Sequence, residues 1–161
     1  MAITIQPGER GAHEFLKNHK VGVLATVSPD GDPYAAAIYY TVDSAFNISF
    51  LTKTGTKKAD NLEHKNLAML VVYEAASQTT VQVAGSVSKI TNDDEINEVF
   101  RQIVHASLDT GNTDLAPIFK LDEGNYVTYR LTPTQIRMAS FSHAKSGGYK
   151  TLFKTINPAN G

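Results

Sequence analysis

The chain has 161 residues, a formal net charge of −1 and no cysteine. Without cysteine it can form no disulfide, thiolate nucleophile, iron–sulfur cluster or cysteine-ligated zinc site. A charge so close to zero argues against a nucleic acid or an anionic membrane as partner, since clustered positive charge binds both. With 42% hydrophobic residues, one folded domain over 1–161 is expected. No apolar run reaches the about 18 residues that span a bilayer, and no signal peptide is visible, so a cytoplasmic protein is expected.

The N-terminal quarter of the chain predicts an amphipathic helix and a β-hairpin. Apolar residues within 9–19 recur at helical spacing, so this helix should cover an edge of the core. Strands are expected over 20–28 and 33–42, because a dense turn sequence around Asp30-Gly31 separates them. The small middle of the second strand, 35–38, would let a flat ligand lie close to the sheet; it would equally fit beneath a large neighbouring side chain.

Residues 48–62 are the most informative stretch. The first part, 48–53, alternates and predicts a strand, which Gly55 breaks before Thr56 caps a short helix. The turn is rich in hydroxyls and cations, namely Thr52, Thr54, Thr56, Lys53, Lys57 and Lys58. Together with the free N–H groups of a helix N-terminus, these suit a phosphate, although a solvated lysine loop before an ordinary helix has the same composition. No earlier glycine completes a P-loop around Gly55.

The following region predicts two strands and a helix. Residues 67–73 are almost continuously apolar, which is typical of a central strand buried on both faces. Residues 79–90 alternate cleanly, and Gly85 within them predicts a bend or bulge. Asn92 is placed to cap an amphipathic helix over 93–107.

The C-terminal part predicts a loop, two strands and a tail. The loop covers 108–122, and the strands 125–131 and 134–141 lie on either side of Pro133. The tail, 142–161, is expected to be mobile or draped over a neighbouring part of the molecule. Because strands dominate and mostly follow one another directly, the chain predicts a mainly β fold, an antiparallel barrel with a few peripheral helices.

No side-chain constellation typical of a hydrolase or a nucleophilic enzyme is present. The sequence lacks a Gly-x-Ser-x-Gly elbow, and its histidines show no metal-ligand spacing. These histidines are His13, His19, His64, His105 and His143. Any chemistry is therefore expected from a bound cofactor with a phosphate tail and a flat ring.

Several segments, in matching order and spacing over about 21–90, resemble the pyridoxamine 5'-phosphate oxidase-like, FMN-binding split-barrel family. They are Asp30-Gly31-Asp32-Pro33-Tyr34, Phe50-Leu51-Thr52, Thr56-Lys57-Lys58, Asn61-Leu62 and Val81-Gln82-Val83-Ala84-Gly85. The resemblance implies a six-stranded antiparallel split β-barrel, a homodimer, and FMN in a cleft between the subunits.

The resemblance also implies which residues contact FMN. A lysine pair would hold the phosphate, the strand before it and the alanine-rich strand would pass along the cofactor, and a threonine of a later strand would reach the flavin. The residues implied are Ala36, Ala37, Ile38, Tyr39, Leu51, Thr52, Thr56, Lys57, Lys58 and Thr80.

Two departures from the family pattern bear on function. The oxidase proper carries an arginine at the position of Ala36, and a Trp- and Arg-containing C-terminal region that 142–145 does not match. Oxidation of pyridoxamine phosphate is therefore not the expected activity, whereas flavin binding is still expected. The most favoured function is an FMN-dependent oxidoreductase acting on an unknown small molecule. A non-catalytic module holding FMN, a deazaflavin or haem, with His64 or His143 as the axial ligand, stays open, as does a dimerisation scaffold with an empty cleft.

Overall fold

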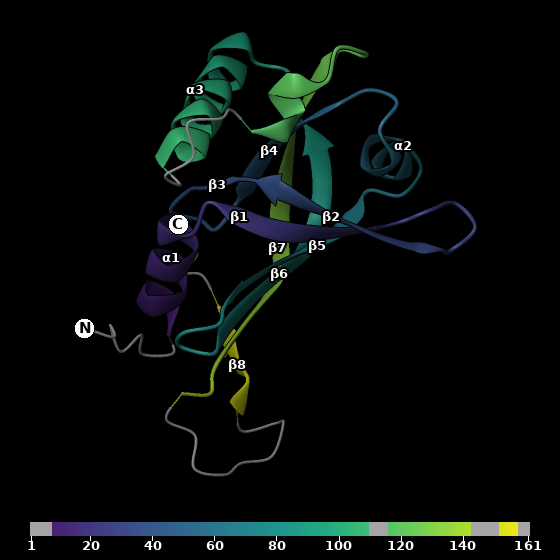
Figure 1. The fold of residues 1–161 in the computed structure, drawn as a ribbon. Helices are drawn as coiled ribbons and strands as arrows, with labels where there is room; N and C mark the ends of the chain where they lie inside the picture. The colour runs from purple at the N-terminus through teal and green to yellow at the C-terminus, as the bar shows by residue number, and fades with distance from the viewer. Residues whose placement is uncertain (1–7, 110–115, 143–151, 158–161) are drawn as a thin grey trace.

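The structure is a computed structural model that describes residues 8–109, 116–142 and 152–157. All strands in these residues join one antiparallel sheet, which helices flank (Figure 1). In chain order the elements are α1 Glu9–Asn18, β1 Val21–Val27, β2 Pro33–Tyr39, β3 Thr41–Val42, β4 Ile48–Lys53, α2 Lys57–His64, β5 Leu67–Glu74, β6 Thr79–Lys89, α3 Asp93–Asp109, η1 Pro117–Lys120, β7 Tyr126–Ser140 and β8 Lys154–Ile156. The strand order is β2-β1-β5-β6-β7-β4-β3, and β8 pairs with β7. The sheet curls into a half-barrel, which confirms the expected split-barrel class; the described part of the chain contributes eight strands to it instead of six.

The curl includes a bulge where the two longest strands, β6 and β7, pair. The register shifts between Ala84 and Gly85, and Thr134 is left as the extra residue of β7. A side chain at Gly85 would meet the carbonyl oxygen of Thr132 at 1.9 Å, so only glycine allows this approach. The bulge predicted at Gly85 is confirmed. The separation into two strands at Pro133 is wrong, because the bulge accommodates a residue without an N–H inside a single strand.

Strand β4 lies between two cores and is buried along its whole length. Inside the half-barrel, its inner face packs in the main apolar cluster, which includes Phe15, Leu24, Phe46, Phe50, Leu70, Val83 and Leu131. On its other face, Leu51 packs with Ile103 and other residues of α3 in a second cluster. The second cluster places α3 over the outer face of β4, and this packing forms one wall of the site described below.

The helix starts follow the capping residues that the sequence indicates. At the start of α2, the Ala59 N–H donates to Thr56 Oγ1 at 3.4 Å. At the start of α3, the Glu95 N–H donates to Asn92 Oδ1 at 3.0 Å. No helix in the described residues is long and apolar enough to cross a bilayer.

The strand expected over 33–42 is instead divided at Tyr40. The Tyr40 hydroxyl donates to the Leu16 carbonyl at 2.7 Å, and its N–H donates to the Lys20 carbonyl at 3.2 Å. These bonds tie the chain to the end of α1, so that β2 pairs with β1 while β3 pairs with β4. The sequence carries no mark of this division, since Tyr40 is itself a good strand residue.

Strand β5 is not buried on both faces within this chain. Its inward residues are buried, but Leu67 is 52% and Tyr73 is 59% exposed on the outward face. The neighbouring outward residues of β1, Val21 and Val23, are also exposed. The central strand predicted from the apolar run is therefore covered on one side only.

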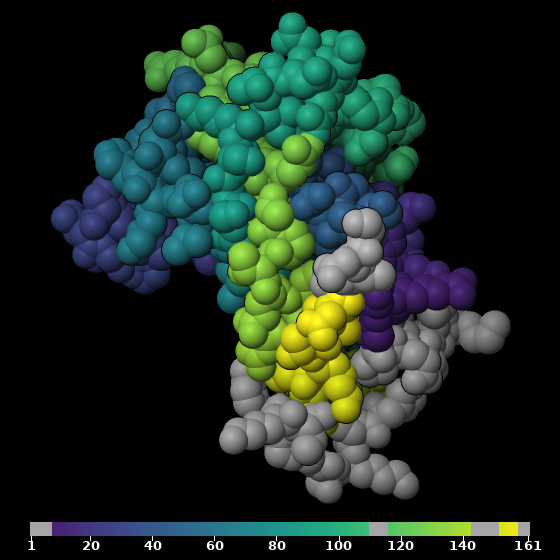
Figure 2. Space-filling view, turned by 180° about the vertical axis from the view of Figure 1, so that it is seen from behind, coloured from purple at the N-terminus to yellow at the C-terminus, as the bar shows by residue number. Residues whose placement is uncertain are grey.

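The tail expected to be mobile contains an ordered strand. Lys154–Ile156 pairs with β7 from Ile136 to Met138, and Ile156 is buried in the main core. Figure 2 shows β8 lying along β7 at the end of the molecule away from α3. An apolar residue in a polar tail is a weak sequence signal, because its burial depends on a strand that ends 16 residues earlier in the sequence.

Candidate functional site

A cavity of about 450 Å³ lies where β2, β4, α2 and α3 meet. Its walls are largely apolar and include Val21 of β1, Leu51 of β4 and Ile103 of α3. The segment 116–121, which contains η1, forms a further wall. Its volume falls within the range of cofactor and small-ligand pockets, about 300–1,000 Å³.

Half of the residues that the resemblance implies line this cavity. They are Ala37, Ile38, Tyr39, Leu51 and Lys58. They come from two strands that are not adjacent in the sheet and from the first turn of α2. Strand β2 is also the edge of the sheet, and an edge strand presents unpaired main-chain N–H and C=O groups that can bond a ligand.

Lys58 is the cation at the β4–α2 end of the cavity. Its side chain is half-buried, and burial lowers the pKa of its ammonium group. It forms no hydrogen bond or ion pair with any residue that the structure describes. A half-buried ammonium without an acceptor is unfavourable. An anionic group in the cavity would remove this penalty.

The packing of α2 decides which of the two adjacent lysines faces the cavity. The helix buries Ala59, Asn61 and Leu62 against the sheet, and the Asn61 amide donates to Thr26 Oγ1 of β1 at 3.0 Å. This orientation places Lys58 in the cavity wall, whereas Lys57 is exposed and does not line it.

The threonine hydroxyls of the turn are used within the chain. The hydroxyls of Thr52 and Thr56 are bonded to each other at 2.9 Å, and Thr56 Oγ1 donates to the Lys53 carbonyl at 2.8 Å. Thr54 Oγ1 accepts from the Asn125 N–H. Their bonds hold the turn that presents Lys58, and the free donors of this corner are the first main-chain N–H groups of α2.

The other residues implied by the resemblance lie outside the cavity wall. Ala36 pairs with Leu24 on β1, whose side chain is buried in the core, so it shares the inward face of the sheet. Thr80 pairs with Tyr73 of β5 on the outward face. In this single chain the cavity therefore contains neither of them.

The wall contributed by Ile103 and 116–121 is not evident from the sequence. Ile103 fits the apolar face of a helix, and 108–122 reads only as a loop. Phe119 of η1 packs against Phe100 and Tyr126, with ring centroids 4.9 and 6.1 Å apart. Its aromatic character in a polar loop is the one local signal of this packing.

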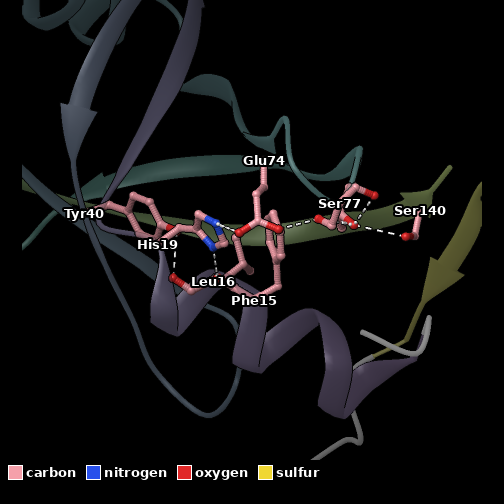
Figure 3. A network of polar contacts seen from close by, with 8 residues as sticks. Phe15, Leu16, His19, Tyr40, Glu74, Ser77 and Ser140 are labelled. Carbon is pink, nitrogen blue, oxygen red and sulfur yellow. Dashed lines mark hydrogen bonds and ion pairs between the residues drawn. The ribbon is translucent and has the colours of Figure 1, made fainter. Parts of the chain in front are cut away.

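The described histidines lie elsewhere. His19 Nδ1 is 2.7 Å from the Phe15 carbonyl and Nε2 is 3.2 Å from the Glu74 carboxylate, so both ring nitrogens are occupied (Figure 3). His64 is exposed, with Nδ1 bonded to the Asp60 carbonyl. No histidine of the described residues lines the cavity, and His143 lies outside the described residues.

The sequence matches the family model described as pyridoxamine 5'-phosphate oxidase over residues 10–139. The chain belongs to this family. The match contains β4, the lysine turn and α2, and so includes the whole Lys58 end of the cavity. No curated protein matches the sequence.

Solved structures of other proteins share the fold. An FMN-binding protein related to pyridoxamine 5'-phosphate oxidase, from Nostoc punctiforme, is 17% identical with a TM-score of 0.57, covering 98% of this chain and 100% of that one. A heme-binding protein from Mycobacterium smegmatis is 19% identical with a TM-score of 0.64, and the match covers 94% of this chain and 59% of that one. A conserved hypothetical protein from Mycobacterium tuberculosis is 20% identical with a TM-score of 0.66, and the match covers 93% of this chain and 98% of that one. At these identities the similarity establishes the fold.

The lowered pKa of Lys58 predicts a pH-dependent stability difference. Between its folded pKa and the unfolded value of about 10.4, the unfolded chain binds more protons, so the free energy of unfolding rises with pH across this window. The destabilisation caused by the half-buried Lys58 ammonium is fully present at pH values below the pKa of the folded state. It is lost at pH values above the pKa of the unfolded state. The Lys58→Met variant, without ligand, should therefore have a higher free energy of unfolding than the wild type near pH 7. This difference should shrink towards pH 10.5. Urea unfolding of both proteins at several pH values measures this, and a difference that does not change with pH contradicts it.

Proposed function

We propose that this protein binds FMN in the cavity beside Lys58 and acts as a flavin-dependent oxidoreductase on a small molecule. The observation that carries the proposal is the half-buried Lys58 ammonium, which has no acceptor among the described residues and faces a largely apolar cavity. The family, and the FMN bound by a protein of the same fold, support FMN as the guest.

The chemistry of the cavity fits the two ends of FMN. Lys58 and the free N–H groups at the start of α2 would hold the phosphate, since charge-assisted donors and a helix N-terminus both favour an anion. The isoalloxazine ring would lie among Ala37, Tyr39 and Leu51, where small and apolar side chains let a flat ring approach the sheet. The main-chain groups at the edge of β2 are available to the polar rim of the ring.

The chain's own part in the reaction is to bind, orient and exclude water. FMN supplies the transfer of electrons or hydride when bound. The lining residues with a titratable side chain are Tyr39, Lys58 and Lys120. A hydride transfer to or from a flavin needs no side-chain acid or base, so this set suffices for the proposal.

Removing the phosphate-binding charge should weaken FMN binding selectively. We expect Lys58→Ala to raise the Kd for FMN about ten- to a hundredfold, since a charge-assisted hydrogen bond contributes ~1.5–3 kcal/mol and ~1.4 kcal/mol is a factor of ten. Titration followed by flavin fluorescence measures it. The matched control is Lys65→Ala, which removes an exposed charge at the far end of α2. An equal loss of FMN affinity in both variants, or an unchanged Kd in Lys58→Ala, would show that Lys58 is not part of the site.

Oxidoreductase activity has a direct spectroscopic test. We expect the purified protein, loaded with FMN, to be yellow and to lose its visible absorption when NADH or NADPH is added without oxygen. A loaded protein that resists both reductants indicates a non-catalytic flavin module. A protein that takes up haem but rejects FMN would replace the proposal with the haem-binding alternative.

We further propose that a second copy of this chain covers the exposed outward face of β1 and β5. Val23 pairs with Val71 across these strands, and Val23 is 44% exposed although the face is apolar. Val21 belongs both to this face and to the wall of the cavity. A partner packed here would therefore lie at the cavity entrance and close it.

This homodimer can be tested by placing a charge on the face. We expect Val23→Arg to convert a dimer to a monomer in analytical ultracentrifugation and to weaken FMN binding, because a buried unpaired charge is costly and the cavity would lose its second wall. Leu108→Arg, at an exposed apolar position on α3, is the control. A wild-type protein that sediments as a monomer with FMN bound would refute the dimer while leaving the FMN site intact.

A further inference from the structure

Lys53, at the end of β4, is a buried lysine that the phosphate site does not use. Its side chain is only 6% exposed. It occupies the same face of β4 as Leu51, which lines the cavity. Lys53 Nζ donates to the Leu121 carbonyl and lies over the Tyr126 ring, 4.8 Å from its centroid.

The two partners of this ammonium are Leu121, in the segment that forms one wall of the cavity, and Tyr126, in the strand that follows it. Leu121 ends the cavity wall formed by 116–121, and Tyr126 begins β7. Among the described residues no carboxylate pairs with Lys53. A buried ammonium is costly without such partners, so its stabilisation depends on the segment staying in place.

The contacts around Lys53 hold the same segment against β4. The Thr54 N–H donates to the Asn125 carbonyl at 2.9 Å, and the Asn125 N–H donates to Thr54 Oγ1 at 3.0 Å. Gly124 has a φ of +80°, and a side chain there would meet the Thr54 carbonyl oxygen at 2.5 Å. The end of β4 and residues 121–126 are thus joined tightly enough that only glycine fits between them.

We propose that Lys53 is a positioning residue that fastens the 116–121 segment over the cavity and so sets how long a bound flavin is retained. The inference rests on the proposed FMN site and deepens it. It assigns the two lysines of one turn to different tasks. Lys58 acts on the phosphate, whereas Lys53 acts on the wall of the cavity and therefore on the ring end of the ligand.

Riboflavin separates these two tasks because it carries the ring without the phosphate. We expect Lys53→Met, which keeps an unbranched side chain of nearly the same length but removes its charge, to speed the release of both FMN and riboflavin about tenfold in stopped-flow fluorescence. We expect Lys58→Ala to weaken FMN binding much more than riboflavin binding. Tyr126→Leu removes the ring beneath the ammonium and should speed the release of both ligands in the same direction as Lys53→Met.

The outcomes distinguish this inference from the proposed function. A wild-type protein that binds neither flavin contradicts the FMN site itself. If the wild type binds both and Lys53→Met releases them at the wild-type rates, Lys53 does not fasten the wall. If Lys53→Met speeds the release of FMN but not of riboflavin, the Lys53 charge acts on the phosphate and the inference is wrong. Should Lys53→Met lose its near-ultraviolet circular dichroism, the release rates of Lys53→Leu decide in the same way.

Discussion

The site depends on a single unfavourable arrangement, a half-buried ammonium that the protein does not neutralise. Lys58 is brought into the cavity by the orientation of α2, and that orientation is fixed by the buried face of the helix and by the bond from Asn61 to Thr26. The turn before it is held by hydroxyl bonds, so Lys58 cannot escape to water by a shift of the main chain alone. Preorganising a charge in this way destabilises the empty protein and would strengthen the binding of an anionic ligand.

The parts of this arrangement that could be predicted from sequence are those with local causes. Thr56 and Asn92 cap their helices because a side chain reaches main-chain groups only three residues away. Gly85 forms a bulge because no other residue fits the approach of Thr132. These signals lie within a few residues of the structure that they produce, so each can be recognised from the sequence alone.

The parts that could not be predicted depend on contacts far apart in the chain. Lys57 and Lys58 are chemically alike, and only the packing of α2 on β1 decides that one of them faces the cavity. The wall at 116–121 joins β4 through Lys53, a contact 68 residues apart in the sequence. Tyr40 ends β2 because of α1, and Ile156 is buried because of β7. In each case the residue type allowed several environments, and the tertiary structure selected one of them.

The exposed outward face of β5 explains why an apolar run in the sequence supports the proposed dimer. The apolar run over 67–73 predicts burial on both faces, but this chain supplies cover for only one of them. Large exposed apolar faces on a folded chain mark surfaces of association. Val21 lies on this face and at the cavity, so the same contact that buries β5 would also complete the cavity. Dimerisation and cofactor binding are then expected to stabilise each other, because each would bury surface that the other leaves exposed.

The composition of the cavity wall limits the reaction that the protein can support. The titratable groups among the described lining residues are two lysines and a tyrosine, without a carboxylate or an imidazole. Such a wall can hold an anion and a flat ring, but its described residues include no side chain with an ordinary pKa near neutrality to shuttle a proton. If the protein binds a flavin as proposed, a substrate that exchanges hydride with it, and takes or gives its proton through water or through a second copy of the chain, would be compatible with this wall. The selectivity of the protein is then expected to arise from the shape of 116–121, since Lys58 and the start of α2 would hold only the phosphate end.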